Sequence, residues 1–492
     1  MARLPAVRSV KPEECRGQPD FWRDSREAGG PHSMPGSSRL LAWGLAFVAS
    51  LAAVIGLAWT ARHYWHGASQ AMEVAVFFPQ ANAQTWTNFV AGVRLAAAEK
   101  NLRVEENREA FECLVLQDPT PLRFRWYPEV GSRGIQRRVS ELCRRTAPPL
   151  AIVGANNSSL TFALAGEMSR HGMKDQIPIL LMTTATADEL IDILPDRSFR
   201  FGFNNTYQAQ TVVDRLKRFF ADRKIEKPDL NVIVVQVLDN PFSVDLARHF
   251  RHELREKFSP RFISPPTGFF DMGPVEPGDE EEGGNWSVET STGGFDVPTE
   301  EERRLARELV TRMIAEPDKQ WAIVLPLGTT PYRRISFALH GAFTELTDAA
   351  TAQRVKGNLV ILSGDSMDYF DFRDAIRNQL LPEETPAPVI FFAHVNPLDP
   401  TVANKPNPDA SSQNLDRDVA RALLKAFSTV GSNPTPNELA KAVAGYVESG
   451  ASQPFFENRE RRSGGGAIVA SPRPDKQDFL ILLPPEWQAS PK

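Results

Sequence analysis

The sequence has few cysteines and histidines and lacks the short motifs that mark many enzymes. Its 492 residues include three cysteines and eight histidines, and no Cys-x-x-Cys pair occurs, so we expect no structural zinc site or other metal centre. The chain has no Walker loop, no His-Glu-x-x-His and no Gly-x-Ser-x-Gly, which argues against an enzyme and against a cofactor. A formal net charge of −5 disfavours nucleic acid as a partner, because nucleic acid requires a basic face.

Long hydrophobic runs are also absent, with one exception near the N-terminus. Residues 40–59 (LLAWGLAFVASLAAVIGLAW) contain Ser50 as the one clearly polar residue. Twenty helical residues span about 30 Å, the thickness of a bilayer core, so we predict a transmembrane helix over 39–61. Seven arginines and lysines precede the run and only Arg62 follows it closely. This asymmetry predicts that 1–38 form a disordered cytoplasmic tail and that the bulk of the chain is periplasmic or extracytoplasmic.

A cleaved signal peptide is the alternative to this single-pass anchor in the cell membrane. Ser69-Gln70-Ala71 offers a cleavage site, although the leader before the apolar run is unusually long. Cys113 and Cys143 both fall on the outer side, where a disulfide is permitted. Spacing alone does not show whether two cysteines pair, so their pairing stays open.

Strand-like and helical patterns alternate along the rest of the chain. The apolar run VAVFF at 74–78 is followed by an amphipathic pattern over 87–100, and this order repeats. Such alternation predicts an α/β fold, in which helices cover both faces of a parallel sheet. The pattern restarts after residues 199–203, which favours two doubly wound parallel-sheet lobes. Residues 271–299 interrupt it with an acidic, glycine- and proline-rich stretch that we interpret as a mobile surface insertion.

One loop stands out for its polar composition. In AIVGANNSSLTFALAGEMSRHG (151–172), two asparagines and two serines separate an apolar strand from a helix. Ligands of open α/β sheets bind beyond the carboxyl ends of the strands. A helix N-terminus there offers unpaired N–H groups, and Ser158 and Ser159 add hydroxyl donors, which together suit a carboxylate. Simple N-capping explains the same residue types, so both interpretations stand at this point.

Four stretches in series resemble a known family. They are the loop above, LLMTTATADEL (180–190), FRFGFNNTYQAQ (199–210) and NVIVVQVLDNPFSVDLARHFRHEL (231–254). In this order they resemble the type 1 periplasmic binding proteins of the leucine/isoleucine/valine-binding kind, which share a fold with the ligand-binding region of glutamate-type receptors. The resemblance covers nearly everything from Met72 to about Leu483.

The resemblance implies two lobes joined by three crossing segments that close over a ligand. We expect these crossings near Phe199, near 327–331 and near 393–396. The corresponding domains are 72–198 with 331–393 as lobe 1, and 199–330 with 394–492 as lobe 2, which carries the insertion 271–299.

The resemblance also implies which residues of the first lobe contact the ligand. Ser158 matches the serine that holds the ligand carboxylate in amino-acid binders, with Ser159 beside it. Thr184 and Thr186 match the next loop, which contributes a carbonyl and a threonine hydroxyl. Trp86 lies within one residue of a position that often carries an aromatic ligand contact, although a packing role suits it equally.

The second lobe matches the family less well. Phe242 takes the place of an aromatic residue that contacts the ligand, and it too could be a packing residue. Asp365, in LSGDSMD, is the candidate for the carboxylate that pairs with a ligand ammonium, although an Asx turn or a helix cap explains an aspartate there as well.

These residues predict a membrane-anchored extracytoplasmic solute-binding protein. Its ligand would be a small polar molecule bearing a carboxylate, such as an amino acid. Its partner would be a membrane transporter, as in ABC transport of amino acids, or a sensor protein. The alternative is a ligand-free scaffold or interaction protein that retains the fold.

Overall fold

The computed structural model covers the part of the chain that follows the predicted membrane helix. It describes residues 71–482 apart from 79–82, 119, 130, 156, 172–175, 238–239, 264–296, 366–386, 395–409, 449–450, 463–464 and 473–478. The predicted tail (1–38), the predicted transmembrane helix (39–61) and nearly all of the predicted insertion (271–299) lie outside these residues. Among the described residues, no helix is both long enough and apolar enough to cross a membrane.

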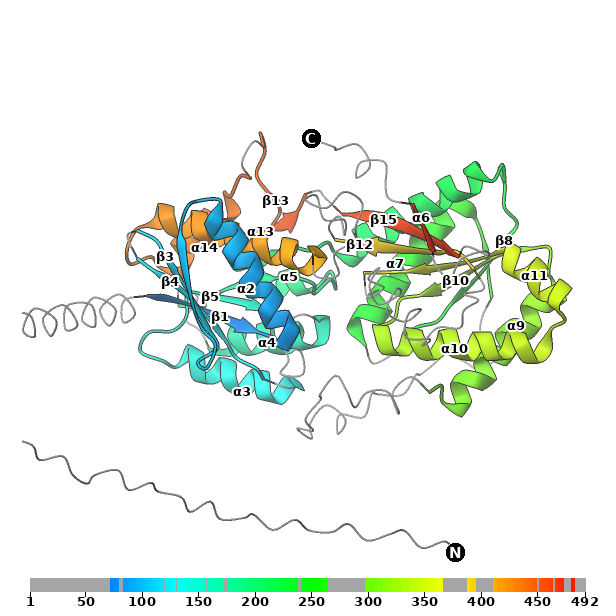
Figure 1. The fold of residues 1–492 in the computed structure, drawn as a ribbon, viewed down its shortest axis with the longest axis horizontal. Helices are drawn as coiled ribbons and strands as arrows, with labels where there is room; N and C mark the ends of the chain where they lie inside the picture. The colour runs from blue at the N-terminus through cyan, green and yellow to red at the C-terminus, as the bar shows by residue number, and fades with distance from the viewer. Residues whose placement is uncertain are drawn as a thin grey trace, which may run out of the picture. The chain divides into compact units, whose positions relative to one another are not determined.

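The first sheet combines the N-terminal part of the described chain with a short hairpin from near the C-terminus (Figure 1). Its order is β13-β14-β7-β6-β5-β1-β4-β3-β2. The pairs from β14 to β4 are parallel, whereas β2–β3, β3–β4 and β13–β14 are antiparallel. The strands are β1 (Met72–Phe77), β2 (Arg103–Asn107), β3 (Glu112–Leu116), β4 (Leu122–Trp126), β5 (Ala151–Gly154), β6 (Ile179–Met182), β7 (Ser198–Arg200), β13 (Phe456–Glu457) and β14 (Glu460–Arg461).

Helices cover both faces of the first sheet, as expected for strands that read as continuous apolar runs. Strands β5 and β6 are buried at every position. One face packs against α2, α13 and α14, and the other against α3, α4 and α5. These helices are α2 (Ala83–Ala98), α3 (Gly131–Cys143), α4 (Ser158–His171), α5 (Leu190–Ile193), α13 (Ala410–Val430) and α14 (Pro436–Ala444). We call this sheet with its helices the first lobe.

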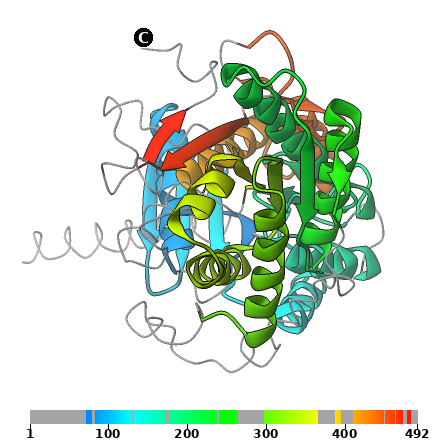
Figure 2. The same cartoon turned by 90° about the vertical axis from the view of Figure 1, so that its right-hand side faces the viewer.

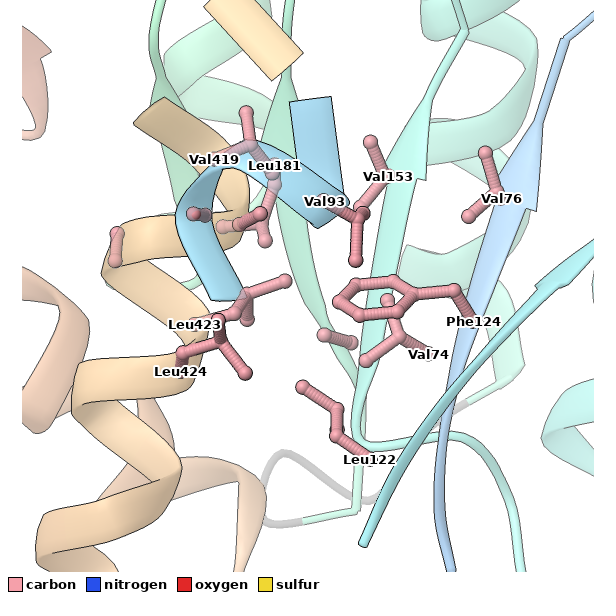
Figure 3. Packing of buried hydrophobic residues seen from close by; sticks show 14 of the residues in the cluster. Val74, Val76, Val93, Leu122, Phe124, Val153, Leu181, Val419, Leu423 and Leu424 are labelled. Atoms are coloured by element: carbon pink, nitrogen blue, oxygen red, sulfur yellow. The ribbon is translucent and has the colours of Figure 1, made fainter. Parts of the chain in front are cut away.

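The core between the first sheet and its outer helices is mainly aliphatic and aromatic. Alternate residues of β1, β4, β5 and β6 point to the same face, because side chains alternate along a strand. They meet the apolar stripes of α2 and α13, helices that are far apart in sequence (Figure 3). The side chains that meet there include Val74, Val76, Leu122, Phe124, Val153 and Leu181 of the sheet and Val93, Val419, Leu423 and Leu424 of the helices.

The second sheet has the order β16-β15-β12-β11-β10-β8-β9. Pairs from β12 to β9 are parallel, and the C-terminal hairpin β15–β16 adds two antiparallel strands, drawn in red in Figure 2. The strands are β8 (Leu230–Val234), β9 (Arg261–Phe262), β10 (Gln320–Leu325), β11 (Leu359–Ser363), β12 (Val389–Ala393), β15 (Gly466–Pro472) and β16 (Phe479–Leu482).

Helices again lie on both faces, and this unit is the second lobe. One face packs against α6 and α7, the other against α9, α10 and α11. The helices are α6 (Asn205–Asp222), α7 (Pro241–Phe258), α9 (Glu300–Ala315), α10 (Thr329–Leu346) and α11 (Ala349–Gly357). Asparagine side chains cap the first two, since Asn204 accepts from the N–H of Tyr207, and Asn240 accepts from the N–H groups of Phe242 and Ser243.

The structure differs from the predicted lobes in their C-terminal parts. Residues 331–393, assigned to lobe 1, contain β11 and β12, which pair with β10 in the second sheet. Within 394–492, assigned to lobe 2, helices α13 and α14 and strands β13 and β14 belong to the first lobe. The reason is that an apolar strand or helix stripe fits either sheet, so local sequence does not choose between them.

One of the three segments that cross between the lobes also differs from the prediction. The chain passes from β7 in the first lobe to α6 in the second, and from β12 in the second lobe to α13 in the first, as predicted near Phe199 and near 393–396. The crossing predicted near 327–331 is wrong, because α10 begins there and packs on the second sheet. The third crossing joins β14 to β15 instead.

The two cysteines of the described chain are both free. Cys113 is buried in the core of the first lobe, and Cys143 ends α3. Burial raises the pKa of the Cys113 thiol to about 12 and that of Cys143 to about 11. Both side chains are therefore protonated, unreactive thiols at neutral pH.

Candidate ligand-binding site

In the polar loop after β5, one side chain caps a helix and another is hydrogen-bonded to the next loop of the sheet. Oδ1 of Asn157 accepts a hydrogen bond from the N–H of Leu160 at 2.8 Å and so caps α4. Ser158, only 3% exposed, uses Oγ to accept from the N–H groups of Thr186 and Ala187, both at 3.2 Å. Ser159 is exposed. N-capping therefore explains Asn157, whereas Ser158 ties its helix to the loop after β6.

The backbone of the loop after β6 forms hydrogen bonds with three other segments of the chain. Besides the two bonds to Ser158, the guanidinium of Arg200 donates to the carbonyl of Ala187 at 2.6 Å, and the N–H of Asn205 donates to the carbonyl of Thr186 at 3.0 Å. The hydroxyl of Thr186 is fully buried and has no hydrogen-bond partner. A buried hydroxyl without a partner is rare and calls for a ligand or a water molecule. This atom is the polar group that the loop leaves free.

The first crossing brings this loop next to the carboxyl edge of the second sheet. Gly202 is packed so closely that a Cβ there would lie 2.4 Å from the carbonyl oxygen of Thr183 and 3.1 Å from Cε1 of His394. Only glycine leaves room for this approach. The loop after β6 and the residue after β12 therefore meet at the crossing.

Asp365 follows β11 and faces His394. Nδ1 of His394 accepts the backbone N–H of Phe203 at 3.0 Å, so Nε2 carries the proton and donates to Oδ2 of Asp365 at 2.7 Å. Both side chains are largely buried, with 7% of His394 and 11% of Asp365 exposed. Gln208 accepts the N–H of Asp365 at 3.1 Å. Because the imidazole in this arrangement is neutral, the Asp365 carboxylate keeps its negative charge and can pair with a cation.

Phe242 and Asn205 connect the two groups. The Phe242 ring lies beside Gly364, with Cζ 3.5 Å from the place of a Cβ on that glycine. Nδ2 of Asn205 lies 3.5 Å from the carbonyl oxygen of Phe242, while the N–H of Asn205 donates to Thr186. The structure thus brings Ser158, Thr186, Phe242 and Asp365, which come from four separate loops and helices, into one continuous set of contacts.

The remaining predicted site residues are Trp86, Thr184 and Ser159. Trp86 is 5% exposed and stacks on Phe89 and Trp126, with ring centroids 5.8 and 6.0 Å apart. It is a core residue of the first lobe, which was the second of its two interpretations. Thr184 is half-buried in the loop after β6. Ser159 is exposed in the first turn of α4.

A charged cluster next to this set links the two lobes. Asp188, after β6, accepts the N–H of Asn205 at 3.0 Å and donates its own N–H to Asp245 of α7 at 3.0 Å. Nε2 of His249 lies 3.2 Å from Oδ2 of Asp188 and 3.3 Å from Oδ1 of Asp245. The hydroxyl of Thr206 also donates to Asp188.

The ionisation of this cluster follows from its geometry. Burial alone would lower the pKa of His249, but the carboxylates of Asp188 and Asp245 outweigh it and raise that pKa to about 9. Burial would likewise raise the pKa of Asp245, but the contact with His249 and further hydrogen bonds hold it at about 2. The pKa of Asp188 is lowered against the effect of burial in the same way. At neutral pH the cluster is an imidazolium between two carboxylates.

Sequence reasoning missed His394, Gln208, Asn205 and the charged cluster. His394 directly follows an apolar strand, VIFFA, which is the position that the carboxyl-edge rule singles out. Asn205 and Gln208 begin α6, where polar residues are ordinary caps, so the sequence carries no signal for them. The charged cluster joins a loop of one lobe to a helix of the other, and only the tertiary structure brings them together.

Comparison with known proteins gives the same fold. No protein-family model and no curated protein matches the chain, but solved structures do. Leucine-binding protein LivK of Thermotoga maritima superposes with a TM-score of 0.52 at 15% identity, covering 85% of this chain and 99% of that one. An ABC transporter solute-binding protein of R. palustris in complex with 4-hydroxybenzoate gives 0.53 at 12%, covering 85% and 99%.

A third neighbour is an ABC transporter substrate-binding protein of Desulfitobacterium hafniense in complex with Leu. Its TM-score is 0.50 at 14% identity, covering 84% of this chain and all of that one. Identities this low speak for the fold. The two lobes, the mixed but mainly parallel sheets and these neighbours together show that the chain has the type 1 periplasmic binding protein fold, the fold of branched-chain amino acid substrate-binding proteins.

Proposed function

We propose that the chain is an extracytoplasmic solute-binding protein, anchored by its N-terminal hydrophobic segment, that captures a small carboxylate-bearing ligand for a membrane transporter or sensor. The observation that carries the proposal is the free hydroxyl of Thr186. Its loop is fixed by Ser158, Arg200 and Asn205, and the hydroxyl is one of the buried polar atoms of the described chain that have no hydrogen-bond partner. A hydroxyl that no protein group uses can form a hydrogen bond to a ligand without breaking one inside the protein.

The charge of Asp365 favours an amino acid over a simple carboxylate. Asp365 pairs with a neutral His394 and so retains a net negative charge in a largely buried place. An ammonium group is the natural counterpart of such a carboxylate. The neighbours described above bind Leu in one case and 4-hydroxybenzoate in another, so both ligand classes occur on this fold.

Thermal unfolding and isothermal titration of the full-length chain with twenty amino acids and a set of hydroxybenzoates test the proposal. A ligand at about 100 times its dissociation constant stabilises the folded state by about 2.7 kcal/mol. Losing a hydrogen bond to a charged ligand costs about 1.5–3 kcal/mol, so we expect Ser158→Ala to weaken binding by about 10- to 150-fold. Ser159→Ala, an exposed neighbour, serves as the matched control and should bind normally.

Asp365→Asn separates the two ligand classes. An asparagine still accepts the hydrogen bond from His394, so the local structure is preserved while the charge is removed. Affinity for an amino acid should fall, whereas affinity for a benzoate, which has no ammonium, should not. No binding across both sets would instead favour the ligand-free scaffold, with Ser158 acting only as a tie between α4 and the loop after β6.

A further inference from the structure

One cavity of the second lobe lies between the C-terminal ends of α6 and α7. Its volume is about 710 Å³, which is within the range of small-molecule sites. Pro228 lines the cavity two residues before β8 begins, so the cavity lies at the amino ends of the parallel strands. The candidate solute site lies beyond their carboxyl ends, and the two places are therefore separate.

Positive charge is concentrated around this cavity. Lys217 lines it from α6, Lys224 and Lys227 from the segment that leads to β8, and Lys257 from the last turn of α7. Glu226 is the one acidic residue in the lining. Four ammonium groups against one carboxylate leave a surplus of positive charge, which attracts an anion.

Three of the four lysines are available to such an anion. Lys257 is the exception, because Oδ1 of Asp214 lies 2.6 Å and Oε2 of Glu253 lies 3.1 Å from its Nζ. The other three lysines are exposed, and they form no ion pair with any residue that the structure describes. Their charge is therefore not neutralised within the described chain.

The backbone at Lys224 is unusual for a lysine. Its φ is 60°, in the left-handed region that glycine or asparagine usually occupies after a helix. The turn is fixed, since the N–H of Lys224 donates to the carbonyl of Ala221 and the N–H of Ile225 to that of Phe220, both at 2.9 Å. A lysine is less stable than glycine in this conformation, and strain of this kind is found at ligand sites.

Two phenylalanines give the cavity an aromatic part. Phe220 is buried and Phe258 is half-buried, and their ring centroids lie 5.8 Å apart with 81° between the ring planes. Ile225 and Pro228 add apolar surface. Aromatic and apolar walls suit a ring, whereas lysine ammonium groups bind phosphate as point charges. The lining therefore combines the two parts of an organic phosphate.

We propose that this cavity binds a small organic phosphate that carries a ring, of which a nucleotide is the representative. Its phosphate groups contact Lys217, Lys224 and Lys227, and its ring lies against Phe258. All the lining residues belong to the second lobe, so binding needs no closure of the lobes. The proposal does not depend on which solute the chain captures.

Isothermal titration of the full-length chain in a mild detergent with chelator tests the proposal, with ATP, inorganic pyrophosphate and adenosine as probes. We expect one bound ATP per chain and no binding of adenosine. Pyrophosphate should bind at least about 3-fold more weakly than ATP, because it lacks the aromatic contact. Raising NaCl from about 50 to about 300 mM should weaken ATP binding, since exposed charges are screened. Absence of ATP binding at the lower salt, or pyrophosphate binding as tight as that of ATP, overturns the proposal.

Charge variants assign the site. An exposed ion pair contributes about 1.5- to 5-fold in affinity, so Lys217→Gln, Lys224→Gln and Lys227→Gln combined should weaken ATP binding by at least about 10-fold. Glu226→Gln removes the acidic group of the lining and should tighten it. Lys441→Gln is the control, because this exposed lysine lies on α14 of the first lobe. ATP binding that survives the triple change, or that the control weakens equally, refutes the assignment.

Lys224→Gly separates binding from folding. Glycine suits the left-handed backbone, so the unfolding temperature should rise while ATP binding weakens. A loss of affinity in a more stable chain cannot come from unfolding. Lys224→Arg keeps the charge and should keep the affinity. A Lys224→Gly chain that binds ATP as tightly as the unmodified one would limit Lys224 to the turn and contradict its assigned contact.

Discussion

Replacing Thr186 by valine should stabilise the protein and weaken its ligand binding at the same time. Valine has nearly the shape of threonine but no hydroxyl, and the Thr186 hydroxyl is buried without a partner. An unpartnered buried hydroxyl costs about 1–3 kcal/mol in proteins. The neighbouring backbone bonds do not involve the side chain, so the loop should remain in place. We therefore expect the free energy of unfolding to rise by about 1–2 kcal/mol without ligand.

Urea unfolding followed by circular dichroism measures this change, and calorimetric titration measures the affinity for the ligand. The matched control is Thr161→Val on α4. Thr161 is equally buried, but its hydroxyl donates to the carbonyls of Ala155 at 3.1 Å and Asn157 at 2.7 Å. Loss of these bonds should lower the free energy of unfolding by about 1–2 kcal/mol, the opposite sign.

A Thr186→Val protein that is less stable by 1 kcal/mol or more would show that the hydroxyl has a partner in the ligand-free state, and the reasoning would fail. Stabilisation combined with unchanged ligand affinity would place the solute elsewhere. Only the combination of higher stability and at least about tenfold weaker binding, equal to 1.4 kcal/mol, fits the proposed role.

Three further predictions concern single side chains. Ser158→Ala leaves two buried N–H groups unpaired, so urea unfolding should show a loss of about 2–4 kcal/mol, against less than about 0.5 for Ser159→Ala. Leu423→Ala removes a side chain with no exposed surface from the first-lobe core and should cost about 2–5 kcal/mol, whereas exposed Lys425→Ala should be neutral. Because its pKa is raised from 9.0 to about 12, Cys113 should react with a disulfide reagent about 1,000-fold more slowly in the folded chain than in urea; equal rates would show an accessible thiolate.

Local sequence patterns were enough to predict the fold class. Near-continuous apolar runs followed by amphipathic stretches predicted parallel strands with helices on both faces, since the periods of strand and helix differ. The restart after residue 199 marked the second lobe, and α6 begins there. Strands β2, β4 and β14 were not predicted. In β4, LRFRW alternates buried and half-buried residues and carried a strand signal, whereas charged β2 (RVEEN) lies at the sheet edge and carried little.

Local sequence also located part of the candidate site. The rule that ligands bind beyond the carboxyl ends of parallel strands directed attention to Ser158 and Ser159. The family resemblance added Thr184, Thr186, Phe242 and Asp365. The sequence did not distinguish packing residues from ligand-binding residues. Trp86 fits both roles in the sequence, and its stacking on Trp126 in the structure identifies it as a packing residue. His394 was missed although it follows a buried strand.

The assignment of elements to lobes was decided by tertiary structure alone. The apolar stripe of α13 fits any sheet of suitable shape, and it packs on the first one, beside α2, after the chain has completed most of the second. The charged cluster of Asp188, Asp245 and His249 likewise joins residues about 60 positions apart. Sequence patterns record which face of an element is apolar or charged. They do not record which distant face it meets, because that choice depends on shape and chain connection over the whole molecule.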